Sequence, residues 1–109
     1  MDDFPPFIAK LPDIDVPFEG VTGYLLQGAD QQVAFLRFAD DTDVPEHQHK
    51  GQWEHVLAGE VTLNAWGETR TYRTGESFYL EEGEPHSAFV KAGYRAIIFF
   101  DQTDRYTTK

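Results

Sequence analysis

The sequence predicts a single all-β domain, folded as a closed barrel or jelly roll. From residue 21 onward, short apolar segments alternate with turn residues at roughly the 8–12-residue spacing typical of all-β folds. No long segment keeps a 3.6-residue apolar period between helix caps. The 109 residues are 40% hydrophobic and 15% aromatic, a composition typical of one packed domain with one core.

Residues 1–20 are expected to form an extended arm, because four prolines interrupt them and proline disrupts helices. Large apolar side chains lie between these prolines, and a free tail seldom carries so much apolar surface. We therefore expect the arm to pack along the barrel or onto a second subunit.

Residues 21–109 are expected to form the barrel itself. The first two strands predicted are "GYLLQ" and "VAFLRF", separated by a short turn. The later candidates are too short to be stable alone, so they must pair into a closed or sandwiched sheet. In chain order, the predicted strand segments are 23–27, 33–38, 55–66 (broken by a turn at Gly59), 71–73, 78–80, 86–92 and 94–101.

Composition and charge exclude several classes of site and partner. The chain has no cysteine, so a metal ion could be held only by histidine, carboxylate, amide or water ligands. The formal net charge is −10 with no basic stripe, which argues against a nucleic-acid partner. No apolar run approaches the ~20 residues of a membrane span, and the N-terminus lacks a signal-peptide pattern. A cytoplasmic protein is the expectation.

Three of the four histidines lie within "PEHQHKGQWEH". Strand alternation would point His47 and His49 to one face, where both could reach one ion. His55 has the opposite parity from Gln52 and Glu54, so we expect it to face away. His86 would have to come from another strand. The spacing alone leaves open whether these side chains bind metal or only titrate in a polar loop.

Two motifs in this chain resemble those of the cupins. The first family motif is G-x5-H-x-H-x3,4-E-x6-G, and here it reads from Asp41 through His47 and His49 to Gly59. The second is G-x5-P-x-G-x2-H-x3-N, which reads here from Gly75 through "ESFYLEEGEPHSAF" to Val90. The resemblance covers roughly residues 33–101 and implies the cupin double-stranded β-helix, a jelly-roll barrel. Asp41, Glu81 and Val90 stand where the motifs have glycine, proline and asparagine.

The resemblance implies a site for one divalent transition metal ion (Zn, Ni, Mn, Fe or Cu) on His47, His49 and His86. The family's glutamate is where this chain departs. Six residues separate Gln52 from Gly59, as in the family motif, whereas four residues separate His49 from Glu54, which also agrees with the motif. We favour Gln52 as the fourth ligand, because the strand entering the Gly59 turn tolerates a deletion less well than the loop after His49. A loss of metal binding is the alternative interpretation, and the three retained histidines argue against it.

Other residues are expected to act around this site. Arg37, Phe35 and Phe100 are candidate substrate contacts, with Arg37 suited to pairing with a carboxylate. Glu54 and Tyr79 are the candidate proton-transfer groups.

The resulting hypothesis is a metal-binding small cupin that acts as an enzyme, of oxygenase, isomerase or lyase type, on a small organic anion. The alternative is a non-catalytic cupin that binds or senses a small ligand. A homodimer is the resemblance's default and agrees with the apolar arm. Fold alone does not fix the chemistry.

Overall fold

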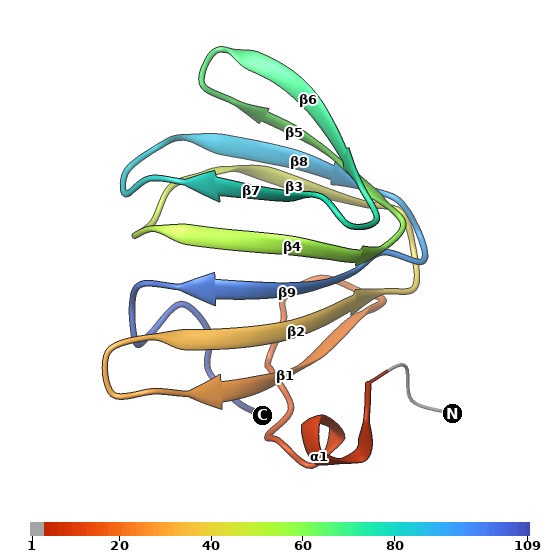
Figure 1. Cartoon of the computed structure of the whole chain (residues 1–109), viewed down its shortest axis with the longest axis vertical. Helices are drawn as coiled ribbons and strands as arrows, with labels where there is room; N and C mark the ends of the chain where they lie inside the picture. Colours follow the sequence, from red (N-terminus) through yellow and green to blue (C-terminus); the bar gives the residue numbers. More distant parts are fainter. Residues whose placement is uncertain (1–3) are drawn as a thin grey trace.

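The computed structural model describes residues 4–109 and is built almost entirely from β-strands (Figure 1). One short helix precedes nine strands. In chain order these are α1 (Pro6–Ala9), β1 (Val21–Gln27), β2 (Gln32–Phe38), β3 (Thr42–His47), β4 (Gln52–Ala58), β5 (Glu60–Ala65), β6 (Glu68–Arg73), β7 (Ser77–Leu80), β8 (His86–Val90) and β9 (Arg95–Phe100). No helix in this part of the chain has the length and apolar character of a membrane span.

The strands form two antiparallel sheets with crossed connections. One sheet has the order β1-β2-β9-β4-β7 and the other β3-β8-β5-β6. The last strand, β9, therefore lies between β2 and β4 in the middle of the larger sheet, and β8 lies between β3 and β5. This arrangement confirms the predicted all-β jelly roll.

The main core lies between the two sheets, where alternate side chains of each strand meet. Strand β4 shows the rule clearly: Gln52, Glu54 and Val56 are buried, whereas Trp53 is exposed and His55 half-buried. A strand with one covered face gives this period of two. Two polar side chains of β4 thus enter an otherwise apolar interior.

The N-terminal arm, expected to be extended over residues 1–20, contains one short helix in its described part, residues 4–20, and residues 1–3 lie outside the described residues. Residues Pro6–Ala9 form one helical turn, because proline fits the first position of a helix, where its missing N–H costs nothing. The Phe4 ring packs edge-on against Tyr24 and Phe35, with centroids 6.1 and 5.8 Å away. The arm therefore covers the outer face of the molecule's own β1–β2 hairpin, beside which α1 lies in Figure 1.

Residues 101–109 fold back along the barrel and are anchored by one buried amide. Gln32, 1% exposed, donates from Nε2 to the carbonyls of Thr103 (3.1 Å) and Tyr106 (2.9 Å) and accepts from the Tyr106 N–H at 3.1 Å. An isolated bridge also joins Thr108 to Ile14. The arm and this C-terminal segment meet at one end of the barrel.

Candidate metal centre

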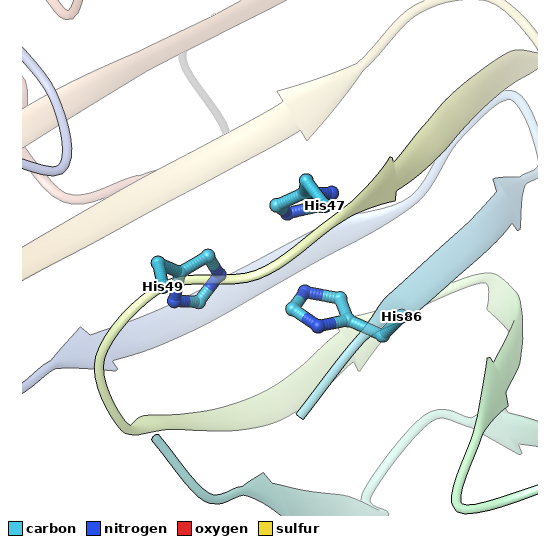
Figure 2. A group of neighbouring side chains, drawn as sticks. All are labelled: His47, His49 and His86. Carbon is cyan, nitrogen blue, oxygen red and sulfur yellow. The ribbon is translucent and has the colours of Figure 1, made fainter. Parts of the chain in front are cut away.

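Three histidines converge between β3 and β8 (Figure 2). His47, the last residue of β3, is paired in register with His86, the first residue of β8. The ring centroids of His47 and His86 are 4.2 Å apart. The ring centroid of His49 lies 5.2 Å from that of His47 and 5.0 Å from that of His86. One nitrogen from each ring lies within 4.8 Å of the other two. The two motifs, far apart in sequence, thus supply one cluster.

Each ring is oriented by a hydrogen bond to a nearby backbone carbonyl. The Nδ1 atoms of His47, His49 and His86 lie 2.9, 2.6 and 2.9 Å from the carbonyl oxygens of Pro45, Lys50 and Glu84. A carbonyl can only accept, so each Nδ1 carries the proton and donates it. Each Nε2 is then left with a free lone pair, the form in which neutral imidazole binds metal.

The surroundings of the cluster favour the neutral form of His49 and His86. The pKa of His49 is lowered to about 4, mainly by burial and also by the charges of Arg105 and the neighbouring histidines, against the opposing effect of the hydrogen bond to the Lys50 carbonyl. Burial also lowers the pKa of His86. The His49 Nε2 atom is buried and has no hydrogen-bond partner among residues 4–109. A buried lone pair without a donor is costly, and a cation bound at this nitrogen would satisfy it, so the residues present fit a metal ion.

The loop that carries His49 is fixed from two sides. The His49 carbonyl accepts from Gly83 N–H at 2.9 Å, which ties this loop to the turn before His86. The next N–H, of Lys50, donates to the Gln102 side chain at 3.1 Å. The His49 ring itself packs edge-on against Phe100, with centroids 5.6 Å apart. His49 lies beyond the end of β3, and these contacts fix its position beside the other two histidines.

A cavity of about 80 Å³ opens beside the histidines, inside the barrel. Its walls are mainly aliphatic and aromatic side chains from both sheets, with Val16 and Phe18 of the arm and Tyr106 of the C-terminal segment at one end. Its polar lining residues are His47, Gln52, Glu54, His86, Tyr94 and Arg105. An apolar cavity with a few convergent polar groups is the usual form of a small-ligand site.

Gln52 and Glu54 enter this cavity from the same face of β4. The Gln52 Nε2 donates to Glu54 Oε1 at 2.8 Å, which turns the amide nitrogen toward Glu54 and leaves the amide oxygen for another partner. Among the described residues, no aspartate or glutamate joins the cluster of three histidines, so the Glu54 carboxylate is not part of it. Gln52 and Glu54 both line the cavity beside His47 and His86, and Gln52 as the fourth ligand stays a prediction.

Glu54 is a buried carboxyl group with a shifted pKa. Burial raises its pKa to about 7, against the opposing effect of hydrogen bonds from Tyr94 and Gln52. The Tyr94 hydroxyl donates to Glu54 Oε2, and burial together with the Glu54 charge raises the pKa of Tyr94. A carboxyl group that titrates near neutral pH beside a ligand cavity can give or take a proton. Sequence reasoning did not identify Tyr94, since a tyrosine next to a turn glycine carries no distinguishing pattern.

The other predicted site residues are divided between the two faces of the larger sheet. Phe100 is buried and lines the cavity. Tyr79 is 59% exposed and points outward from β7, because its neighbours Phe78 and Leu80 take the inward positions. His55 also lies on the outer side, 2.7 Å from the Ser77 hydroxyl, in agreement with the parity argument.

Arg37 and Phe35 require a correction, because neither lines the cavity. The inward positions of β2 belong to Ala34, Leu36 and Phe38. Phe35 packs instead in the outer cluster beneath the arm. Arg37 donates to the Thr22 and Tyr24 hydroxyls at 2.9 and 3.3 Å, on the same outer side.

Arg105 is the cationic side chain that the sequence did not reveal. It lies in the segment after β9, for which no strand or motif pattern exists, and lines the cavity beside the histidines. Its guanidinium carbon lies 5.6 Å from the Phe100 ring centroid and 4.6 Å from that of Tyr106. An arginine next to one aromatic residue, Tyr106, a few positions after the end of β9 was the one available signal, and it is a weak one.

Solved structures with low sequence identity share this fold. An RmlC-like cupin from Shewanella frigidimarina has a TM-score of 0.77 and 20% identity, over 96% of this chain and 95% of its own. KdgF from Halomonas sp. has a TM-score of 0.71 and 19% identity, over 84% and 87%. Oxalate decarboxylase from Lactobacillus farciminis, in a formate complex, has a TM-score of 0.74 and 15% identity; the match covers 93% of this chain but only 34% of that one.

No curated protein matches the chain in sequence. The Cupin domain family, in contrast, matches residues 34–98, more than half of the chain. That range contains both histidine motifs and all three converging histidines, and the two-sheet barrel around them is the one shared with the solved cupins. The chain therefore belongs to the cupin family.

Proposed function

We propose that this protein is a metal-dependent enzyme, of oxygenase, isomerase or lyase type, that acts on a small organic anion in the barrel cavity. The ion would be one divalent transition metal held by His47, His49 and His86. The observation that carries the proposal is the shared orientation of the three rings, each donating from Nδ1 to a carbonyl and offering Nε2. Histidines that were close only by chance would not all have to donate from Nδ1 and leave Nε2 free.

We propose Gln52 as the fourth ligand, through its amide oxygen. The hydrogen bond from its Nε2 to Glu54 supports this orientation of the amide. Three neutral imidazoles and an amide would leave the first coordination shell uncharged. The bound ion would supply Lewis acidity, and an uncharged shell leaves that acidity stronger than a carboxylate ligand would.

Glu54 is the proposed proton-transfer group. Its carboxyl lines the same cavity, and its pKa of about 7 lets it hold or release a proton at neutral pH. Tyr94 and Gln52 each donate to one of its oxygens, which fixes the direction in which the carboxyl faces. Tyr79, the other sequence candidate for proton transfer, points away from the cavity.

Metal content tests the first part of the proposal. The protein would be stripped with a chelator, reloaded with zinc or cobalt(II), and measured by mass spectrometry after dialysis. We expect about one ion per chain for the wild type and for His55→Ala, and much less for His86→Ala, which removes one of three histidine ligands. His55 is the matched control because it lies on the outer face of β4. Less than about 0.2 ion per chain in the reloaded wild type would overturn the metal site.

Turnover separates the enzyme from the non-catalytic alternative. Metal-loaded protein would be incubated with a panel of small carboxylic acids, and the products followed by NMR, with His86→Ala as the inactive control. A ligand that raises the melting temperature by mass action without being converted would favour the binding or sensor module.

A further inference from the structure

We propose that Arg105 is the specificity-determining residue of the cavity, and that it binds the carboxylate of a compact two- or three-carbon acid. This inference rests on the proposed function, since it names the class of anion that would lie beside the metal ion. It assigns to the C-terminal segment the recognition that the sequence had suggested for Arg37.

The charge distribution of the cavity supports this assignment. The chain has 19 acidic against 9 basic residues, so most of its surface repels an anion. Among the described residues that line the cavity, Arg105 is the one lysine or arginine. The guanidinium carbon and the His49 ring centroid each lie 5.6 Å from the centroid of the Phe100 ring. The charge of Arg105 is also one of the smaller contributions to the lowered pKa of His49 and of His86. An anion between Arg105 and the histidines would therefore meet a fixed positive charge.

The guanidinium lies against two aromatic rings. Its central carbon is 5.6 Å from the Phe100 ring centroid and 4.6 Å from that of Tyr106, a cation–π arrangement that makes no use of the N–H groups. The Nε atom is buried without a hydrogen-bond partner, and no carboxylate of residues 4–109 forms an ion pair with Arg105. Arg105 is half-buried, and a charge that is partly removed from water is stabilised by pairing. A carboxylate matches the planar fork of donors that arginine presents, so a ligand of that kind completes the pairing.

The size of the cavity limits the ligand. About 80 Å³ is room for a handful of water molecules and well below the roughly 300 Å³ or more of pockets for drug-sized ligands. A two- or three-carbon acid suits this volume, whereas a sugar acid or a nucleotide exceeds it.

The position of Arg105 is held by the rest of the fold. Its neighbour Tyr106 is hydrogen-bonded to Gln32 through both backbone groups, and the Tyr106 ring packs against Phe100, with centroids 5.6 Å apart. Further along, the Thr107 carbonyl accepts from Asp15 N–H at 2.9 Å. Arg105 is therefore not a side chain on a free tail, and its guanidinium faces the cavity without having to be ordered by the ligand.

The test compares a charged ligand with its uncharged counterpart. Glycolate and glycolamide would each be titrated into cobalt(II)-loaded protein, followed by calorimetry and by the visible cobalt spectrum. We expect the wild type to bind glycolate at least about tenfold more tightly than glycolamide, since hydrogen bonds between charged groups contribute ≈1.5–3 kcal/mol. Arg105→Gln should lose this preference while still binding cobalt, and Arg105→Lys should keep only part of it, because lysine cannot form the bidentate pair.

Arg70→Gln is the matched control, since it removes the same charge from a side chain that is 55% exposed and paired with Glu68. It should behave as the wild type. An unchanged glycolate preference in Arg105→Gln, with or without a lower melting temperature, would overturn the proposal and leave Arg105 a packing residue. If Arg105→Gln does not fold, the wild-type preference and Arg105→Lys decide: no preference in the wild type, or full preference in Arg105→Lys, would overturn it.

Failure of the metal site gives a different result. If the wild type binds no cobalt, the proposed function is wrong, and the same titrations are made on metal-free protein. Glycolate binding that is lost in Arg105→Gln would then still support the role of Arg105, and absence of any glycolate binding would overturn it.

Discussion

Tyr94 donates its phenolic hydrogen to Glu54 inside the barrel, and Gln52 donates to the other oxygen of the same carboxyl group. Two donors aimed at one carboxyl favour its ionised form, whereas burial favours the protonated form. Burial has the larger effect, and the pKa of Glu54 is raised to about 7. The stability of the metal-free protein should therefore depend on the protonation of this one group.

The first prediction concerns stability and pH. Because the pKa of Glu54 is higher in the folded state, about 7, than its ordinary value of 4.5, the folded protein binds the extra proton between those values. The contribution of Glu54 to the free energy of unfolding should be largest below pH 4.5, fall as the pH rises to 7, and stay constant above pH 7. The total change should be up to about 3 kcal/mol. Urea unfolding of chelator-treated wild type and Glu54→Gln at each pH measures it.

The difference between the two proteins isolates Glu54 from other titrating groups. His49, with its lowered pKa of about 4, contributes with the opposite sign: stability falls as the pH drops from 6.5 toward 4. Both proteins share that effect, so it cancels in the difference. A difference that does not vary between pH 4.5 and 7 would show that Glu54 has an ordinary pKa.

The second prediction concerns the fourth ligand. Gln52→Ala removes the proposed amide oxygen and should weaken metal binding by at least the roughly 10–100-fold that loss of an outer partner of a metal ligand costs. Competition with a chromophoric chelator measures the affinity. Glu54→Gln is the comparison: it should change metal affinity much less, and the reverse order would identify Glu54 as the ligand.

The third prediction concerns the anchor of the C-terminal segment. Gln32→Leu removes the partner of the Tyr106 carbonyl and N–H, and one of the two donors to the Thr103 carbonyl, which keeps its hydrogen bond from Gln27 Nε2 at 3.2 Å. The free energy of unfolding should fall by about 1–3 kcal/mol, because the freed backbone groups must either stay unpaired or leave the barrel for water. Faster hydrogen exchange at Tyr106 should accompany it. The neighbouring exposed residue provides the control: Gln31→Leu should lose less than about 0.5 kcal/mol.

The fourth prediction concerns the glycine that ends the first motif. Gly59 has φ +82°, and a Cβ there would lie 3.0 Å from the Tyr94 Cα. Gly67 has a similar φ of +73° with nothing within 4 Å. Gly67→Ala should therefore cost only the ~1–2 kcal/mol of a left-handed residue, and Gly59→Ala a further ~1–3 kcal/mol from crowding against the backbone of Tyr94. Equal losses in urea unfolding would show that the contact with Tyr94 relaxes freely.

Much of the fold could be predicted from the sequence, because the barrel is built from short-range sequence patterns. Short strands, turn glycines and two histidine motifs in order predicted the jelly roll, and the register argument placed Gln52 and Glu54 on the inner face of β4. Strand β2 was different. It is buried on both faces, since the arm covers its outer side, so its sequence shows no alternation and could not reveal whether Phe35 and Arg37 face inward or outward.

The C-terminal part of the site depends on tertiary structure alone. Arg105 reaches the cavity because Gln32 and the Ile14–Thr108 bridge direct the segment that carries it, and none of these long-range contacts leaves a periodic signal. The direction of the Tyr79 side chain was undecided in the sequence for a related reason: three consecutive apolar residues in β7 do not reveal which one faces outward. The homodimer expected from the sequence stays a prediction, which sedimentation of the purified protein would check.

The three hydrogen bonds from Nδ1 to backbone carbonyls have a consequence for how an ion is received. The rotamer entropy of the histidines is already lost before any ion arrives, so binding requires little reorganisation of the chain. The metal-free and metal-loaded forms should accordingly show nearly the same backbone hydrogen-exchange pattern. Such a rigid template selects among divalent ions by how well each accepts a fixed arrangement of nitrogens, rather than by reshaping itself around each one.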